Sequence, residues 1–312
     1  MAADTRPDRV TGVPWSAVVI FVLVSFGLAW LAILPLWLVD ADGSTFDELS
    51  RILPSVMMFA PLVATLVVIF WIRVPRGQRL RFLGMWPLRP AKRVVWFIVA
   101  AAVAPLIIVL ACIGVSSLFG WIQLDLVTFS GLQAELDAPM GTDELRLVML
   151  VQIVAIPFGA IFNVVVTFGE EAGWRGWLLP ALRPLGVWPA LVLTGTIWGL
   201  WHAPVILLGH NFNEPNVWGL LLMTVGSIGW GIVFGWLRLR SGSLWPAVLG
   251  HGALNASGGL VLIVGMADAP VNLALVNPFG VAGWIVLAVV VSILAFAGQF
   301  KREPQLATKQ KA

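Results

Sequence analysis

The sequence predicts an all-α polytopic membrane protein, a bundle of about eight transmembrane helices. The first reason is composition, because 59% of the 312 residues are hydrophobic and only 11% are charged. A soluble domain carries about 25% charged residues. The second reason is a mean hydropathy of +0.94. The third is a series of separate apolar runs, each long enough to cross a bilayer.

These apolar runs predict the individual helices, because a helix needs about 20 residues to cross the hydrocarbon core. The runs fall at approximately residues 15–39, 52–72, 94–119, 147–168, 188–208, 217–236, 244–264 and 281–300. The first run is longer than the apolar region of a signal peptide, and no clear small-residue cleavage site follows it. We therefore expect it to remain as a span.

Basic and acidic residues fall in alternate connections between the runs. With both termini on the inner side, the inner segments hold 17 of the 19 Lys and Arg residues, and the outer loops hold 11 of the 16 acids. The densest inner stretch, residues 73–93, has seven basic residues and no acidic one. Because Lys and Arg are enriched in cytoplasmic loops, we expect an integral, multi-pass protein of the cell membrane with cytoplasmic termini.

The charge and the rare residue types exclude several classes of function. A net charge of +3 would suggest nucleic acid for a soluble protein, but basic residues between spans are topology signals, so we expect no nucleic-acid partner. The basic stretch 73–93 can alternatively bind lipid headgroups. The single cysteine, Cys112, cannot form an internal disulfide, and the absence of tyrosine removes phenolic acid–base chemistry.

Two adjacent carboxylates stand at the end of an apolar run, in the segment 167–177. A charge at membrane depth costs about 2.5 kcal/mol or more, so it needs a reason to be there. Glu171 and Arg175 are four residues apart with the acid first, the better orientation for a helical ion pair. Glu170 lies about 100° around the helix and faces Trp174. Glu170 is therefore predicted to be the freer carboxylate, available as a general base; the alternative is a charge cluster at the helix end.

A histidine lies inside the fifth apolar run, in the segment Trp-Gly-Leu-Trp-His-Ala-Pro at 198–204. Pro204 removes a backbone donor beside His202 and loosens the helix there. The alternative to a catalytic role is a polar tie between neighbouring helices.

A second histidine shares a helical face with an asparagine in the seventh run. His251 and Asn255 are four residues apart, so both side chains can offer donors toward one point. That is the arrangement needed to hold an oxyanion; interhelical hydrogen bonding is again the alternative. His210 stands beside Asn211 and Asn213 in a predicted outer loop, and we expect it to be unrelated to the site.

Taken together, these three motifs carry a family resemblance. Glu-Glu-x-x-x-Arg at 170–175, Trp-x-x-x-His at 198–202 and His-x-x-x-Asn at 251–255 resemble the CPBP family of intramembrane proteases, also called the CAAX protease or Abi family. The resemblance covers roughly residues 167–256. One departure is Trp198, where the family usually has phenylalanine. We accordingly divide the chain into three spans with a basic loop (1–146), a protease core (147–264), and a last span with a basic tail (265–312).

The resemblance implies a mechanism of peptide hydrolysis. Glu170 and His202 would activate a water, His251 and Asn255 would hold the tetrahedral oxyanion, and Glu171 with Arg175 would brace the site. Hydrolysis within a bilayer needs water, so we expect a cavity open to the cytoplasm, with Glu170 at the cytoplasmic end of its helix.

One point of this scheme does not agree with the predicted spans. His202 lies about 21 Å into its own run, at 1.5 Å per residue, whereas Glu170 stands at the edge of its run. Either the fifth helix begins later than predicted or the fourth helix carries Glu170 deeper.

A metal is an open alternative. Glu170, His202 and His251 form a possible His₂Glu set for Zn with a position open for water. No His-Glu-x-x-His pair is present, and the family has been described both as metal-dependent and as using glutamate directly. Asn255 is a poor Zn ligand and a good oxyanion donor, which favours the glutamate–water version.

The expected partner is a protein or peptide substrate that enters from the membrane or the cytoplasm. Two rival functions remain at this point. One is a non-enzymatic membrane protein that binds peptides or proteins, as in bacteriocin self-immunity, and such a protein would tolerate loss of Glu170. The other is a transporter that uses Glu170 and the histidines as a proton relay.

Overall fold

The computed structural model describes residues 12–136 and 139–301. In these ranges the chain is helical, apart from turns and one isolated antiparallel bridge between Leu124 and Gly265. Seven helical segments of the described chain are long and apolar enough to cross a membrane: Trp15–Leu38, Ser44–Trp71, Ala91–Leu118, Thr142–Phe162, Val217–Ser241, Trp245–Val264 and Leu273–Phe296. The prediction of an all-α, multi-pass integral membrane protein is confirmed.

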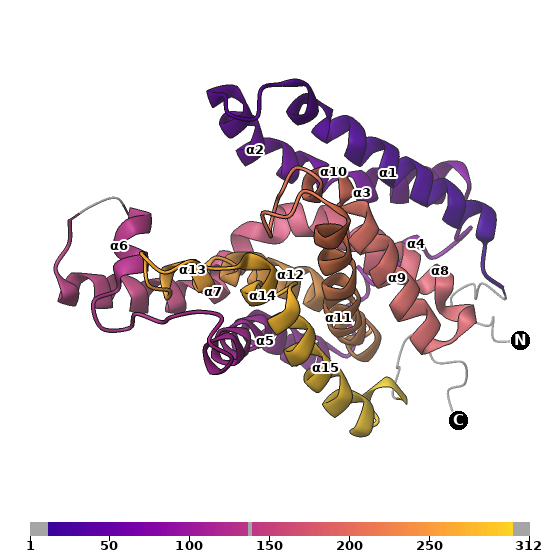
Figure 1. The fold of residues 1–312 in the computed structure, drawn as a ribbon. Coiled ribbons are helices and arrows are strands. Elements are labelled where there is room, and N and C mark those ends of the chain that lie inside the picture. Colours follow the sequence, from indigo (N-terminus) through magenta and orange to yellow (C-terminus); the bar gives the residue numbers. More distant parts are fainter. Residues whose placement is uncertain (1–11, 137–138, 302–312) are drawn as a thin grey trace, which may run out of the picture.

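The elements follow one another along the chain as a series of long helices separated by short ones (Figure 1). The α-helices are α1 (Trp15–Leu38), α2 (Ser44–Met57), α3 (Ala60–Leu66), α4 (Arg79–Phe82), α5 (Ala91–Leu118), α6 (Ser130–Leu136), α7 (Thr142–Glu171), α8 (Leu179–Leu182), α9 (Val187–Trp201), α10 (Ala203–Ile206), α11 (Val217–Ser241), α12 (Trp245–Ser257), α13 (Leu260–Ile263), α14 (Leu273–Val276) and α15 (Val281–Phe296). Two π-helical turns, η1 (Val67–Trp71) and η2 (Ala172–Leu178), and two 3₁₀ turns, η3 (Arg183–Leu185) and η4 (Gln299–Lys301), complete the described chain.

The fifth predicted span differs from the prediction. Instead of one helix over 188–208, α9 has 15 residues and stops at Trp201, and the four-residue α10 follows. Pro204 lies in the first turn of α10 and has no N–H to continue the helical ladder. This crossing is therefore made by a short helix and a turn, and His202 lies at the break.

The fourth helix carries Glu170 deeper than predicted. After α7 ends at Glu171, the chain stays helical through η2 and α8 to Leu182, about 18 Å beyond Glu170 at 1.5 Å per residue. His202 lies a similar distance, about 22 Å, from the start of α9. The two side chains thus lie at similar distances from the turn 183–186, which agrees with the second explanation given above, that the fourth helical run carries Glu170 deeper than its apolar run suggested.

The charged connections gather at two opposite ends of the bundle, with α4 and α8 at one and α6 and α13 at the other (Figure 1). We call the first the basic end, formed by residues 73–93, 183–186, 238–244 and 299–301, which hold Lys and Arg and no acid. We call the other the acidic end, formed by residues 39–48, 119–136, 139–144, 207–216 and 265–272, which hold acids and no Lys or Arg. The chain termini, residues 1–11 and 302–312, lie outside the described residues.

Hydrogen bonds tie the segments of each end together. At the basic end, Leu244 N–H donates to the Gly84 carbonyl (2.8 Å) and Arg93 Nε donates to the Ser241 carbonyl (3.3 Å). At the acidic end, Met266 N–H donates to the Gln123 carbonyl (2.8 Å). The two ends are therefore structural units of the bundle as well as groups of charges.

Candidate active site

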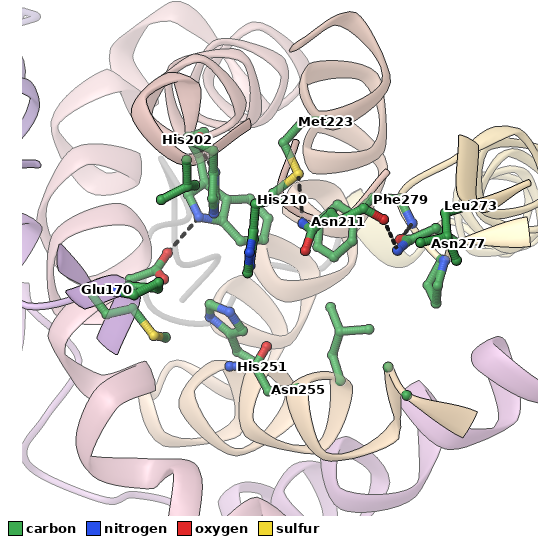
Figure 2. Close-up of a pocket in the computed structure, with 18 of the residues that line it drawn as sticks. Glu170, His202, His210, Asn211, Met223, His251, Asn255, Leu273, Asn277 and Phe279 are labelled. Atoms are coloured by element: carbon green, nitrogen blue, oxygen red, sulfur yellow. Dashed lines mark hydrogen bonds between the residues drawn. The ribbon is translucent and has the colours of Figure 1, made fainter. Parts of the chain in front are cut away.

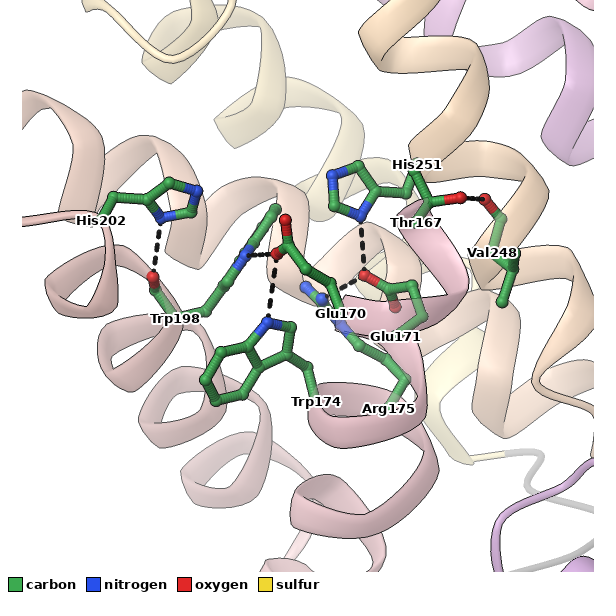
Figure 3. A network of polar contacts seen from close by, with 9 residues as sticks. All are labelled: Thr167, Glu170, Glu171, Trp174, Arg175, Trp198, His202, Val248 and His251. Atoms are coloured by element: carbon green, nitrogen blue, oxygen red, sulfur yellow. Dashed lines mark hydrogen bonds and ion pairs between the residues drawn. The ribbon is translucent and has the colours of Figure 1, made fainter. Parts of the chain in front are cut away.

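Glu170 is buried at the centre of a polar network that joins four helical segments (Figure 3). Its Oε2 accepts one hydrogen bond from Trp174 Nε1 (3.2 Å) and a shorter one from Trp198 Nε1 (2.6 Å). The other oxygen, Oε1, accepts no hydrogen bond from the described residues, and the side chain lines a cavity. The predicted proximity of Glu170 and Trp174 is confirmed, and Glu170 keeps one oxygen free for a bound molecule.

Glu171 points the other way and joins two basic side chains. Its Oε1 lies 2.6 Å from Arg175 Nη1 and 3.0 Å from His251 Nδ1, and Glu171 and Arg175 are both fully buried. The predicted pair of Glu171 and Arg175 is confirmed. The bond to His251 was not predicted, because no spacing rule relates residues on different helices.

The ring of His202 is oriented by a backbone carbonyl. Its Nδ1 lies 2.8 Å from the Trp198 carbonyl oxygen, one turn earlier in α9. A carbonyl oxygen only accepts, so Nδ1 carries the proton, and in the neutral ring Nε2 is an acceptor. The break after Trp201 leaves His202 half-buried on the cavity wall.

Trp198 is the aromatic centre of the site. Its ring lies beneath the Arg175 guanidinium, 4.4 Å from Cζ, and meets both histidines edge-on, with ring centroids 5.7 Å from His202 and 5.4 Å from His251. Phe234 stacks on the other side of His251 at 5.5 Å. The departure from phenylalanine at this position thus adds an indole N–H that binds Glu170.

The π-helical turn η2 holds Trp174 and Arg175 at the centre of the bundle. A Cβ on Gly173 would lie 2.5 Å from Pro61 Cβ, so the glycine allows η2 to approach α3 closely. Buried Arg238 of α11 donates from Nε to the Arg175 carbonyl (3.2 Å) and from Nη2 to the Phe82 carbonyl (2.9 Å). A π-turn inserts an extra residue into a helix and is common at functional sites; it was not visible in the sequence.

A cavity of about 460 Å³ brings four predicted site residues together (Figure 2). Glu170, His202, His251 and Asn255 line it, from three separate helical segments. Glu171 and Arg175 lie behind this wall, fully buried. Most of the remaining wall is apolar, from Met57, Met58, Met223, Leu254, Leu262, Leu273 and Phe279 among others.

Three cavity residues were missed by the sequence interpretation. His210, Asn211 and Asn277 also line the cavity, and the prediction that His210 is unrelated to it is wrong (Figure 2). His210 and Asn211 belong to the turn after α10, which folds back because the helix breaks at His202. No periodic pattern marks a turn residue as a cavity residue, so the sequence carried no signal for them.

The cavity lies toward the acidic end of the bundle. Its loop residues come from the α10–α11 turn, the segment after α12, and residues 277–279 before α15. None of the residues that line it belongs to the described segments of the basic end. The sequence predicted a cavity open to the cytoplasm, the side expected for the basic end, whereas the residues that line the cavity lie toward the acidic end.

Packed aromatic rings separate Glu170 from the basic end. Trp174 and Trp177, on η2, are fully buried, and Phe21 of α1 stacks on Trp177 with centroids 5.0 Å apart. Trp177 Nε1 donates to the carbonyl of Val74, in the basic loop (2.8 Å). On its other side Trp174 packs edge-on against Trp201 of the cavity wall at 5.7 Å. We call Phe21, Trp174 and Trp177 the aromatic floor.

The residues suggested for Zn do not form a metal-ligand group. Across residues 12–136 and 139–301, no three His, Cys, Asp or Glu side chains are close enough together to hold a metal ion. Glu170 Oε2 accepts from two indoles, and Nδ1 of each histidine is held by an oxygen, of the Trp198 carbonyl for His202 and of Glu171 for His251. The same contacts on Nδ1 are common in metal-bound histidines, so the open His₂Glu set for Zn stays a prediction.

Comparison with known proteins agrees with the motifs. A protein-family model described as type II CAAX prenyl endopeptidase Rce1-like matches residues 148–257. A curated relative, CAAX prenyl protease 2 of Methanococcus maripaludis, is 27% identical over 114 residues, which are 35% of this chain and 42% of that protein. The chain thus matches less than half the length of this relative. The segment matched by the family model contains the six motif residues, so the motifs, the family model and this relative agree in a similarity of residues 148–257 to the CAAX proteases.

Proposed function

We propose that this protein is an intramembrane endopeptidase of the CAAX protease type. The observation that carries the proposal is the meeting of Glu170, His202, His251 and Asn255 on one cavity, with an oxygen of Glu170 left free. A protein that only binds peptides has no need of a free carboxylate oxygen, here Glu170 Oε1, together with an acceptor nitrogen, here His202 Nε2. A hydrolase needs both groups, because together they can hold a water molecule and take its proton.

In this mechanism Glu170 and His202 act on the same water. One O–H of the water points to Glu170 Oε1 and the other to His202 Nε2. As the water oxygen attacks the peptide carbonyl, its proton passes to Glu170. The C–N bond then breaks with transfer of that proton to the leaving amine, so that a carboxylic acid and an amine are formed and Glu170 is again ionised.

The oxyanion formed by this attack needs donors on the opposite side. Asn255 supplies an amide N–H, one turn after His251 on α12. His251 is the second donor of this proposal, and the carboxylate of Glu171, 3.0 Å from its Nδ1, fixes the orientation of its ring. Glu171 and Arg175 thus act as positioning residues, because they hold His251 and do not reach the cavity. Glutamate–water chemistry is our proposal over a Zn mechanism.

The proposal is tested by comparing protein termini in cells that express wild type or Glu170→Ala at matched levels, by mass spectrometry. We expect new termini with wild type only. A matched control is Glu214→Ala, which removes an acid from the α10–α11 turn outside the cavity wall and should leave the new termini in place. Identical termini in wild type and Glu170→Ala would contradict the proposal and favour a binding function.

A further inference from the structure

The end of the bundle on which the cavity lies decides which side of the membrane delivers the substrate. The basic end holds seven basic residues and no acid in the stretch 73–93 alone. Further arginines, at 183, 238 and 240, belong to the same end, and Leu244 and Arg93 tie its segments together. Because loops rich in Lys and Arg stay in the cytoplasm, the basic end is cytoplasmic and the acidic end is extracytoplasmic.

The residues that line the cavity lie toward the acidic end, and packed aromatic rings lie toward the basic end. The outer wall of the cavity includes His210 and Asn211, from the 207–216 segment of the acidic end, and Asn277, whose Nδ2 donates to the Asn211 carbonyl. On the other side of Glu170 lies the aromatic floor, whose tryptophans are at most 1% exposed. A peptide from the cytoplasm would have to displace these packed rings and the hydrogen bond from Trp177 to Val74.

We propose that the site opens to the extracytoplasmic side, and that the substrates are apolar peptide segments that leave the membrane on that side. The identity of the substrate rests on the proposed peptidase function. The side on which the site opens rests on the charges at the two ends and on the residues that line the cavity. The name of the CAAX proteases suggests a cytoplasmic substrate. In this inference the substrate is instead the juxtamembrane segment of an exported or membrane-anchored protein.

The cavity wall agrees with a substrate of this chemistry. Its described residues include no Lys or Arg, and their single acid is Glu170. The methionines and leucines suit apolar side chains, since Met adapts to varied shapes. The carboxamides of Asn211, Asn255 and Asn277 can donate to and accept from a peptide backbone. A neutral, apolar peptide therefore matches the wall better than a charged one.

The direction of the cavity can be measured without any substrate. The single cysteine, Cys112, is fully buried in α5, and Cys112→Ala gives a background without thiols. Three single cysteines are then introduced. Ala91→Cys reports the basic end and Ala267→Cys the acidic end, both at exposed positions, and Met58→Cys reports the cavity wall. A small, membrane-impermeant methanethiosulfonate is added to right-side-out and inside-out vesicles.

We expect Ala267→Cys and Met58→Cys to react in right-side-out vesicles only, and Ala91→Cys in inside-out vesicles only. Reaction of Met58→Cys from the same side as Ala91→Cys would overturn the inference, as would a Met58→Cys that reacts from neither side. Reaction of Ala267→Cys from the cytoplasmic side would overturn the orientation.

A second arm separates this inference from the proposed peptidase function. The labelling is repeated with Glu170→Ala, and we expect the same pattern, because access does not depend on catalysis. In the comparison of termini, the new termini should map to extracytoplasmic segments. If no termini change while the labelling pattern holds, the peptidase function fails and the open direction stands. If termini change only in cytoplasmic segments, the direction fails and the peptidase function stands.

Discussion

Glu170 owes its orientation to two indoles that come from different helices. Trp174 is its neighbour on the same helical face, but the shorter bond comes from Trp198, on α9. A hydrogen bond to a charged group contributes about 1.5–3 kcal/mol. The residue that departs from the usual phenylalanine of the family thus adds an interaction with the proposed base.

Replacing Trp198 by phenylalanine keeps an aromatic ring and removes the indole donor. We expect Trp198→Phe to lower kcat about tenfold or more, because an interaction worth about 1.5 kcal/mol with the catalytic carboxylate is lost. KM should change little, since the ring remains. Cleavage of a substrate found by the comparison of termini, followed in detergent, measures both constants.

The matched control for that change is Trp245→Phe, which removes an indole donor to the Met85 carbonyl (3.2 Å), a bond to the basic loop and outside the cavity wall. An equal loss of kcat in both variants would indicate general loosening of the core instead of a specific effect on Glu170.

Variants of Arg175 and of Glu170 should differ in their effects on thermal stability, although both should lower activity. Removing one partner of a buried ion pair costs about 3–5 kcal/mol, because the other charge is left without compensation. Arg175→Ala should therefore lower both thermal stability and activity, whereas Glu170→Gln should abolish activity and keep stability. Buried Cys112 allows the measurement, since a thiol-reactive dye binds it only on unfolding. A Glu170→Gln variant as active as wild type would remove Glu170 from the role of base.

At the scale of elements, regular periodicity was easier to predict than its interruptions. The long helices and the pair of Glu171 and Arg175 follow from apolar length and i,i+4 spacing. Pro204 was expected to loosen the helix beside His202, but not to end it there. The π-turn η2 was missed, because no local pattern in a uniformly apolar sequence marks it. These interruptions bring Glu170 and His202 to similar distances from the turn 183–186. The meeting of Glu171 with His251, across helices, is likewise a property of the fold.

Helix α9 reaches its position because glycines let it approach α11. A Cβ at Gly199 would lie 2.4 Å from Thr224 Cα, and one at Gly195 would lie 2.7 Å from Ile228 Cα. Small residues at helix interfaces permit such close packing in membranes. Trp198 lies in the last turn of α9 and His202 directly follows the helix. The distance between α9 and α11 therefore decides where both side chains lie.

Widening this interface by one methyl group should displace the site. We expect Gly199→Ala to cost about 1–3 kcal/mol through overpacking and to reduce activity by moving His202. Unfolding followed through Cys112 and the cleavage rate check the two effects. Gly27→Ala is the control, because its Cβ would meet nothing within 4 Å on exposed α1. A Gly199→Ala variant as stable and active as this control would show that the α9–α11 contact tolerates displacement.

At the scale of the whole molecule, the family segment is not enclosed by its own residues. The match covers residues 148–257, yet Phe21 of α1 stacks on Trp177, and Pro61 of α3 packs against Gly173. Helix α5 also packs along α12, the helix of His251. The first half of the chain, which carries no motif, therefore supports the site directly.

A split of the chain between α6 and α7 tests this dependence. We expect residues 139–312 expressed alone to aggregate or remain inactive, although they hold all six motif residues, because α12 and η2 would lose their partners. Co-expression with residues 1–138 should restore a folded complex, since the packing is noncovalent and the cut leaves every long helix whole. Size-exclusion chromatography in detergent and the cleavage assay measure the two properties. If the second half alone were folded and active, the first three spans would not contribute to the site, and the contacts of Phe21 and Pro61 would be incidental to it.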